Sequence, residues 1–284
     1  MAADVAACRA HTTVQGGRDV SRWPAPRYGH CLITGASAGI GRAFAQALAS
    51  RAERLTITAR RGERLALLAE ELEGRHGIAV TPVTCDLLAT GAVRDLLGRL
   101  DGEVDLLVNN AGFGRFGPLE RFPWQDYQQM IRLNVTAMAE LTFGVWKSVR
   151  ARPGRGVIHV ASVAGFQPLP GFAVYAATKA FVRSWSLALS AEGRGSGTRV
   201  TCLSPGPVAT EFGEHARMTF DNPKPFMPVD QVVAAALRGY EAGRREVVPG
   251  LVNKVLTWGP RLLPVGVQLA LARRFLSTAS TSED

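Results

Sequence analysis

The sequence predicts an α/β protein with a single doubly wound parallel sheet of about seven strands and helices on both faces. Short apolar runs alternate with longer stretches that carry apolar residues at helical spacing. Such alternation is typical of parallel strands joined by helical crossovers. We expect strands at 30–34, 54–59, 78–84, 104–108, 156–161, 198–203 and 246–249, and helices at 40–50, 62–75, 89–100, 124–150, 172–192 and 230–241.

The chain of 284 residues divides into three segments. Residues 1–27 lack the continuous apolar stretch of a signal peptide and are expected to form a flexible arm. Residues 28–250 hold all the expected strands and are long enough for one large domain. Residues 251–284 form an extra C-terminal segment, amphipathic and helical, whose polar tail at 277–284 is expected to be disordered.

Composition and charge exclude some kinds of protein. The chain has 33 basic and 24 acidic residues, a formal charge of +9, but its arginines are scattered and no aromatic and basic cluster resembles a nucleic-acid motif. The four cysteines stand far apart and lack metal-site spacing, which favours a reducing compartment over a disulfide framework. We therefore expect no metal and no nucleic acid, and attribute the basic excess to a cofactor-phosphate site and to the C-terminal region.

A glycine-rich turn follows the first expected strand. It reads Thr34-Gly35-Ala36-Ser37-Ala38-Gly39-Ile40-Gly41, and residues with helical spacing come directly after it. Gly35 allows a tight turn, Gly39 lets the backbone approach a pyrophosphate, and Gly41 lets helix and strand pack closely. Strand, glycine turn and helix are the context of a dinucleotide-binding fingerprint, with the first N–H groups of the helix facing the phosphates. The alternative is a glycine-rich loop without a ligand.

A tyrosine and a lysine stand four residues apart in Val174-Tyr175-Ala176-Ala177-Thr178-Lys179, and Ser162 lies upstream of them. Spacing of four puts the phenol and the ammonium on one face of a helix. A lysine that close is expected to lower the pKa of the tyrosine, which then exchanges a proton near neutral pH. Alone, the pattern is weak, because it arises by chance on many helices.

Several motifs in a consistent order resemble those of the NAD(P)-dependent short-chain dehydrogenase/reductase family, over about residues 28–250. Besides the glycine turn and the Tyr175–Lys179 pair, they are Asn109-Asn110-Ala111-Gly112, Arg132-Leu133-Asn134-Val135, Val160-Ala161-Ser162-Val163-Ala164-Gly165 and Pro205-Gly206-Pro207-Val208-Ala209-Thr210. The resemblance implies a Rossmann fold and an oxidoreductase that uses a nicotinamide cofactor.

The resemblance also implies roles for individual residues. The catalytic set is Asn134, Ser162, Tyr175 and Lys179. In reduction, Ser162 and Tyr175 would donate hydrogen bonds to the substrate oxygen, and Tyr175 would supply the proton. Lys179 would hold the ribose hydroxyls, and Asn134 would anchor a water that links Lys179 to solvent. The expected cofactor-binding residues are Gly35, Ser37, Ala38, Gly39, Ile40, Gly41, Arg42, Arg60, Asp86, Leu87, Asn110, Ala111, Gly112, Tyr175, Lys179, Pro205, Gly206, Val208 and Thr210.

The residues after the second strand favour NADP(H) over NAD(H). The family's NAD enzymes usually place an acid there for the ribose 2′-OH, but here Ala59 is followed by Arg60 and Arg61. Arg60 is expected to bind a 2′-phosphate, assisted by Arg42; the alternative is a solvated turn. Asp86 is expected to contact the adenine amine, or else to cap the helix that begins near Thr90.

Aromatic residues near the expected catalytic set favour a lipophilic or acyl substrate. Phe113, Phe116 and Phe212 are the candidate substrate contacts, with Ser162, and further apolar residues lie in the loop 211–228. An equally weighted alternative is that these aromatics seal the core. Leu251–Leu276 is too short and too interrupted to span a bilayer, and it could rest on a membrane surface, line the substrate pocket or pack as a terminal helix or dimer contact.

The sequence thus predicts a cytoplasmic NADPH-dependent carbonyl reductase, reversible as an alcohol dehydrogenase, acting on a fairly apolar ketone or 3-oxoacyl compound. We expect a homodimer or homotetramer, with membrane association as an alternative through 251–276. Two other hypotheses are a non-catalytic NADP(H)-responsive binding protein and a membrane-peripheral hydroxysteroid or lipid dehydrogenase.

Overall fold

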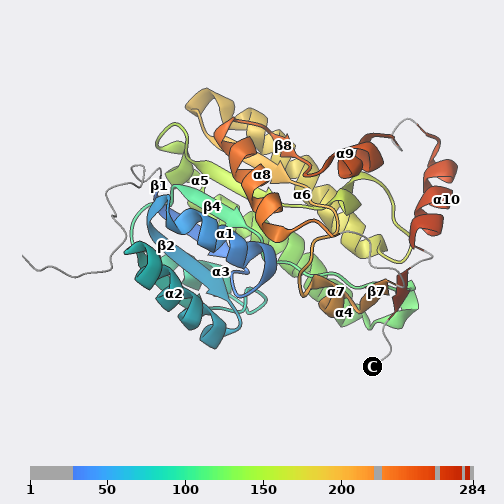
Figure 1. The fold of residues 1–284 in the computed structure, drawn as a ribbon, viewed down its shortest axis with the longest axis horizontal. Helices are drawn as coiled ribbons and strands as arrows, with labels where there is room; N and C mark the ends of the chain where they lie inside the picture. Colours follow the sequence, from blue (N-terminus) through green and yellow to red (C-terminus); the bar gives the residue numbers. More distant parts are fainter. Residues whose placement is uncertain (1–27, 221–225, 260–262, 277–278, 282–284) are drawn as a thin grey trace, which may run out of the picture.

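The computed structural model describes residues 28–220, 226–259, 263–276 and 279–281. Seven strands form one sheet in the order β3-β2-β1-β4-β5-β6-β8, and every neighbouring pair is parallel (Figure 1). The strands are β1 (Tyr28–Thr34), β2 (Ala52–Ala59), β3 (Ala79–Thr84), β4 (Leu106–Asn109), β5 (Gly156–Val160), β6 (Arg199–Leu203) and β8 (Glu246–Val247). The predicted doubly wound parallel sheet is therefore confirmed. The expected arm at 1–27 lies outside the described residues.

Helices cover both faces of the sheet. On one face lie α1 (Gly39–Ala49), α2 (Gly62–His76) and α8 (Val229–Glu241), whose buried side chains join those of β1 and β2 in one core. On the other face, α3 (Ala92–Gly98) and α5 (Met138–Arg150) pack on β1, β4 and β5, and α6 (Ala173–Glu192) packs on β5 and β6. The central strands are buried on both faces, which explains their continuous apolar runs.

The expected helix at 124–150 contains a change of helical type. It consists of α4 (Trp124–Ile131), a π-helical stretch η3 (Arg132–Ala137) and then α5. A π-helical turn inserts an extra residue per turn and often occurs at functional sites. Asn134, a predicted catalytic residue, lies within this stretch and is buried.

After β6 the chain forms several short elements whose individual positions the sequence did not predict. A short helix α7 (Phe212–Ala216) and a strand β7 (Met218–Phe220) form part of the loop 211–228. The C-terminal segment forms α9 (Leu251–Trp258) and α10 (Val265–Leu276), as helices were expected there. These elements lie together at one end of the molecule, at the right of Figure 1.

One expectation for the tail is wrong. Within 277–284, residues Ala279–Thr281 form a strand, β9, that pairs antiparallel with β7, with Phe220 opposite Ala279 and Met218 opposite Thr281. The remaining residues of the tail lie outside the described part of the chain. A polar tail gains backbone hydrogen bonds from an available strand edge, which composition alone does not reveal.

Candidate active site

The glycine turn and the segment after β4 are held side by side by Thr34. Its hydroxyl oxygen accepts hydrogen bonds from the backbone N–H groups of Asn110 and Ala111, both at 2.9 Å. The Asn110 side-chain amide donates in return to the Thr34 carbonyl, also at 2.9 Å. Since β1 and β4 are neighbours in the sheet, these bonds connect two loops at the same sheet edge.

The glycine turn has the geometry that its residues predict. Gly39 has a φ of +52°, where a side chain would be strained, and a Cβ on Gly41 would lie 2.3 Å from the Gly35 carbonyl oxygen. The helix that follows, α1, has no side-chain cap at Ala38 and no acidic residue in its first turn. Its first N–H groups are therefore suited to an anionic group such as a pyrophosphate.

Tyr175 and Lys179 lie one turn apart in α6 and are both buried. The Lys179 ammonium donates to the Val160 carbonyl at the end of β5 (2.8 Å) and lies 5.7 Å from the centre of the Tyr175 ring. The structure therefore brings the predicted pair together at the sheet edge that carries the glycine turn. A Cβ on Gly112 would come within 3.6 Å of Lys179 Nζ, so the segment after β4 reaches the same place.

Ser162 joins Tyr175 at this site. Its hydroxyl oxygen accepts a hydrogen bond from the Ala164 N–H (3.1 Å), which caps the short helix η4 (Val163–Phe166). A hydrogen bond between Ser162 and Tyr175 also acts to lower the pKa of the phenol. Capping, the alternative that the sequence left open for Ser162, and a position beside Tyr175 thus occur together in one side chain.

The expectation of a lowered tyrosine pKa is wrong. Burial raises the pKa of Tyr175 to about 12, and the Ser162 hydrogen bond opposes this only in part. Burial also lowers the pKa of Lys179 to about 8. The sequence pattern shows that the two groups are close, but it does not show how much water each has lost, and here desolvation is the larger effect.

Asn134 is fixed by protein partners. Its side-chain oxygen accepts from the Phe113 N–H (3.1 Å), and its amide donates to the Phe113 carbonyl (2.9 Å) and to the Thr178 hydroxyl (3.1 Å). Thr178 precedes Lys179 in α6, so Asn134 ties the segment after β4 to the catalytic helix. Its expected link to solvent through a water stays a prediction.

The three predicted substrate contacts lie in one apolar cluster with Tyr175. Phe212 packs at 5.4 Å from the Tyr175 ring, and Phe116 is buried against Phe172 at 4.9 Å between ring centres. Phe113 is half-buried at the edge of the cluster. Leu276, the last residue of α10, packs against the same cluster, so the C-terminal segment reaches the site.

Of the two arginines after β2, the structure orients Arg61 toward the glycine turn. Its guanidinium donates to the Ser37 hydroxyl from Nε (3.2 Å) and Nη2 (3.1 Å). Arg60 is exposed and, among the described residues, its head group makes no hydrogen bond or ion pair. Arg42, the expected assistant, instead pairs with Glu71 of α2 at 3.0 Å.

The segment after β6 runs along both parts of the site. The Pro205 carbonyl accepts from the Val163 N–H (3.0 Å), next to Ser162. Farther along, Thr210 lies against the glycine turn, since a Cβ on Gly39 would come within 3.1 Å of its side chain. Gly206 faces Asn253 of α9, and Val208 pairs with Met227 in an isolated bridge. The segment thus contacts the turn beside Ser162, the helix α9 and the glycine turn.

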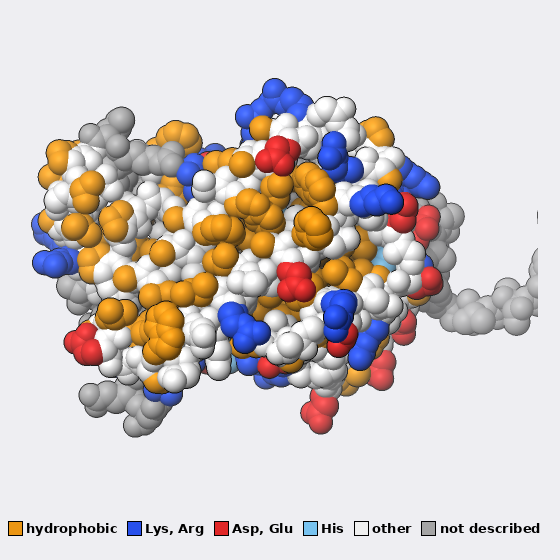
Figure 2. Space-filling view, turned by 180° about the vertical axis from the view of Figure 1, so that it is seen from behind, with side chains coloured by type: hydrophobic (Ala, Val, Ile, Leu, Met, Phe, Trp, Pro, Cys, Tyr) orange, Lys and Arg blue, Asp and Glu red, His pale blue; other side chains and the backbone are white. Residues whose placement is uncertain are grey.

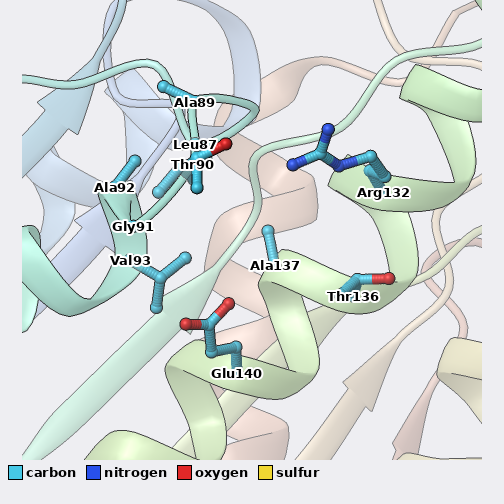
Figure 3. Close-up of a pocket in the computed structure, with 10 residues that line it drawn as sticks. All are labelled: Leu87, Ala89, Thr90, Gly91, Ala92, Val93, Arg132, Thr136, Ala137 and Glu140. Carbon is cyan, nitrogen blue, oxygen red and sulfur yellow. The ribbon is translucent and has the colours of Figure 1, made fainter.

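Asp86 and Leu87 lie in the turn between β3 and α3. The Asp86 carboxylate accepts from the Leu88 N–H (3.1 Å), and α3 begins only at Ala92, so Asp86 closes a local turn and is not the cap of that helix. Leu87 lines a cavity of about 120 Å³ whose walls are the turn 87–93 and the helical stretch 132–140 (Figure 3). None of the catalytic set lines this cavity, so it is not the catalytic pocket.

Sequence reasoning missed Thr34, Arg61, Glu211 and Leu276. Thr34 belongs to the glycine-turn motif, but the motif alone does not predict its hydrogen bonds to the loop after β4. Arg61 is next to Arg60 in the sequence, and only the position of Ser37 shows which of the two side chains faces the glycine turn. Glu211, which pairs with Arg61 at 2.7 Å, and Leu276 are both brought in by chain segments distant in sequence, and no local signal marks them.

Known proteins resemble this chain throughout the site. The family model "short chain dehydrogenase" matches residues 29–219. An uncharacterized oxidoreductase of Myxococcus xanthus is 35% identical over 251 residues, which cover 87% of this chain and 97% of the relative. The structure of a short-chain dehydrogenase from Sphingobium yanoikuyae in complex with NADPH has a TM-score of 0.74 and 32% identity, covering 88% of this chain and 95% of that one.

A second solved structure shows the same architecture. The bulky-bulky ketone specific alcohol dehydrogenase of Comamonas testosteroni has a TM-score of 0.71 and 28% identity, covering 88% of this chain and 93% of that one. The fold, the order of motifs and the family match agree. The chain belongs to the short-chain dehydrogenase family and is an oxidoreductase that acts on CH–OH or C=O groups.

Proposed function

We propose that the protein reduces a ketone or 3-oxoacyl carbonyl to a secondary alcohol, or catalyses the reverse, with Tyr175 as the general acid/base. The observation that carries this proposal is the buried Tyr175 beside Ser162 and Lys179. Its raised pKa keeps the phenol protonated at neutral pH, which is the form that a carbonyl reduction consumes. The bound cofactor supplies or accepts the hydride.

Residues of the chain would transfer the proton, stabilise the charge on the substrate and bind the ribose. As charge builds on the substrate oxygen, the Tyr175 hydroxyl transfers its proton to that oxygen, and the Ser162 hydroxyl stabilises the charge by a hydrogen bond. The Lys179 ammonium donates one N–H to the Val160 carbonyl and has two further N–H groups that can bind ribose hydroxyls. Asn134 positions Lys179 through Thr178 and the backbone of Phe113.

The chain's own residues fit a dinucleotide. The first turn of α1 offers N–H groups without a side-chain cap, and Gly39 brings its backbone close without a Cβ. Lys179 and the glycine turn lie at one sheet edge, on either side of the segment held by Thr34. The NADPH complex of the Sphingobium yanoikuyae relative supports the same class of cofactor.

The proposed preference for NADP(H) rests on Arg61, whereas the sequence predicted Arg60 for this role. Arg61 faces the glycine turn, and no acidic residue stands at Ala59 to bind a ribose 2′-OH. A planar guanidinium held there is suited to a 2′-phosphate. Arg60 and Arg42 are expected to contribute less, because their head groups point to solvent or to Glu71.

The aromatic cluster favours an apolar substrate. Phe113, Phe212 and the buried Phe116 surround Tyr175 with apolar surface, and Leu276 adds to it. Such a lining accepts a bulky ketone or an acyl chain better than a small charged one. The ketone specificity of the Comamonas testosteroni relative agrees with this choice.

The acid/base role is tested with Tyr175→Phe. We expect kcat to fall by about 10²- to 10⁴-fold, the size of general acid catalysis, while the Kd for NADPH changes little. Tyr127→Phe is the matched control, because this buried tyrosine of the same cluster donates its hydroxyl to the Leu119 carbonyl and has no other hydrogen bond within the described part of the chain. Both are measured by NADPH oxidation over a panel of ketones. Turnover retained by Tyr175→Phe contradicts the role, and NADPH binding without turnover by the unmodified protein supports a non-catalytic binding protein.

The cofactor preference is tested with Arg61→Ala and Arg60→Ala. Loss of a charge-assisted hydrogen bond to a 2′-phosphate should lower the NADPH/NADH ratio of kcat/KM by about tenfold or more in Arg61→Ala. Arg60→Ala should change the ratio much less. A larger effect of Arg60→Ala would assign the phosphate contact to Arg60, as the sequence predicted.

The protonation of Lys179 gives a pH dependence. Burial lowers its pKa to about 8, so the ammonium form predominates below that pH and is lost as the pH rises through it. Since the ammonium is the better donor for ribose hydroxyls, the affinity for NADPH should be highest well below pH 8 and weaken as the pH rises through this pKa. The Kd for NADPH is measured over roughly pH 6–10, beyond both sides of this pKa. Lys179→Met should bind weakly without this inflection; an unmodified protein without the inflection contradicts the assignment.

We propose that the C-terminal helices contact a membrane surface, which is one of the alternatives that the sequence leaves open for this segment. Exposed apolar side chains line α9 and α10, and Figure 2 shows such side chains beside basic ones at the α10 end, on its left. The stretch 247–276 has basic but no acidic residues, which favours an anionic lipid surface over a second copy of itself. None of the described helices has the length and apolarity to cross a bilayer. Cytoplasmic localisation and a homo-oligomer stay predictions.

The lipid contact is tested by flotation with vesicles that contain phosphatidylserine or only phosphatidylcholine. We expect flotation with the anionic vesicles, and its loss in a Val252→Glu, Val255→Glu double variant, because both side chains are exposed on α9. Phe143→Glu, at an exposed apolar position of α5, is the control and should still float. Equal recovery of the double variant and the unmodified protein would contradict a contact through α9.

A further inference from the structure

An ion-pair cluster joins the segment after β6 to the turn after β2. The Glu211 carboxylate accepts from Arg61 Nη1 at 2.7 Å and from Arg64 Nη1 at 2.6 Å, so each of its oxygens has its own guanidinium. The partners are about 150 residues apart in sequence, at separations of 150 and 147. Neither the fold nor the proposed catalytic step requires this contact.

Glu211 takes the Arg61 nitrogen that Ser37 leaves unused. Arg61 uses Nε and Nη2 for the Ser37 hydroxyl, which fixes the plane of the guanidinium, and Nη1 is the donor given to Glu211. A phosphate on the adenosine ribose, beside the glycine turn, would be recognised by these same donors. The carboxylate and the phosphate therefore need the same side chain.

The Glu211 carboxylate is negatively charged, as the phosphate is, and can therefore take its place beside the arginines. Hydrogen bonds from Arg61 and Arg64 hold the pKa of Glu211 at about 2, so it is ionised at any working pH. Both arginines and Glu211 are partly exposed, and exposed ion pairs are worth little each. The cluster is thus weak enough for a phosphate to replace the carboxylate.

We propose that Glu211 is a built-in competitor for the 2′-phosphate of the cofactor. It pairs with Arg61 and Arg64 when no 2′-phosphate is present and gives way when NADP(H) binds. The proposal rests on the NADP(H) site proposed above. With NADH, the pairing persists and the arginines keep a counter-charge, so Glu211 reduces the discrimination that the two arginines alone would give.

The residues on either side of Glu211 in the sequence connect this competition to the substrate side of the site. Thr210 lies against Gly39, and Phe212 packs against the Tyr175 ring, so Glu211 stands between two cofactor- and substrate-facing contacts. Displacing Glu211 therefore loosens the attachment of a segment that borders the substrate cluster. By linkage, whatever holds this segment in place also affects the binding of the 2′-phosphate.

The test is equilibrium binding to the full-length protein carrying Glu211→Gln, which keeps the shape and removes the charge. NADPH and NADH are compared, together with adenosine 2′,5′-bisphosphate and adenosine 5′-monophosphate, which differ only in the 2′-phosphate. Glu214→Gln is the matched control, because this neighbouring carboxylate on α7 is exposed and no side-chain contact of it is described. Arg61→Ala is measured in parallel, and thermal unfolding checks that each variant folds.

We expect Glu211→Gln to bind NADPH and the bisphosphate about three- to tenfold more tightly, the range for losing a partly exposed competing pair. NADH and the monophosphate should bind as before, and Glu214→Gln should change nothing. Unchanged or weaker NADPH binding in Glu211→Gln, with weaker binding in Arg61→Ala, overturns the competition and leaves the proposed cofactor site intact. If Arg61→Ala also leaves NADPH binding unchanged, the proposed cofactor site is wrong and the inference falls with it.

Discussion

The parallel pairing of β1, β4 and β5 is the constraint on which the site depends. In a parallel sheet every carboxyl end lies at the same edge, so the loops after these three strands must be neighbours. Those loops carry the glycine turn, Asn110 to Gly112, and Ser162. The hydroxyl of Thr34 then fixes the first two loops to each other, and the Val160 carbonyl anchors Lys179 beside the third. A change of strand order would separate all of these groups.

Burial sets the electrostatic state of Tyr175 and Lys179. It raises the pKa of Tyr175 to about 12 and lowers that of Lys179 to about 8, so the loss of water is the largest effect on both groups. The site therefore starts with a protonated phenol, which suits a proton donor. Oxidation needs the phenolate, so it requires charges or hydrogen bonds beyond those of the protein alone. The direction in which the enzyme works thus depends on what binds next to these groups.

The segment after β6 contacts several parts of the candidate site. Pro205 bonds to the turn beside Ser162, Thr210 touches the glycine turn, Glu211 holds the arginines, and Phe212 packs on Tyr175. The C-terminal segment also reaches this region, because β9 pairs with β7 and Leu276 joins the aromatic cluster. A single stretch of chain is therefore in contact with the glycine turn, with Tyr175 and with the C-terminal segment.

The sequence by itself determined the doubly wound parallel fold and the glycine turn, and it was enough to propose Tyr175 as the acid/base, because the patterns behind all three consist of residue types at short, fixed spacing. Tyr175 and Lys179 had to share a helix face, and Gly39 and Gly41 had to be free of side chains where the chain turns. Only the tertiary structure decided that Arg61 and not Arg60 faces Ser37, that Glu211 meets two arginines, and that residues 279–281 pair with β7. The physical reason is that these contacts join segments far apart in the chain, and that both their partners and the desolvation of Tyr175 depend on how the whole sheet and its loops pack.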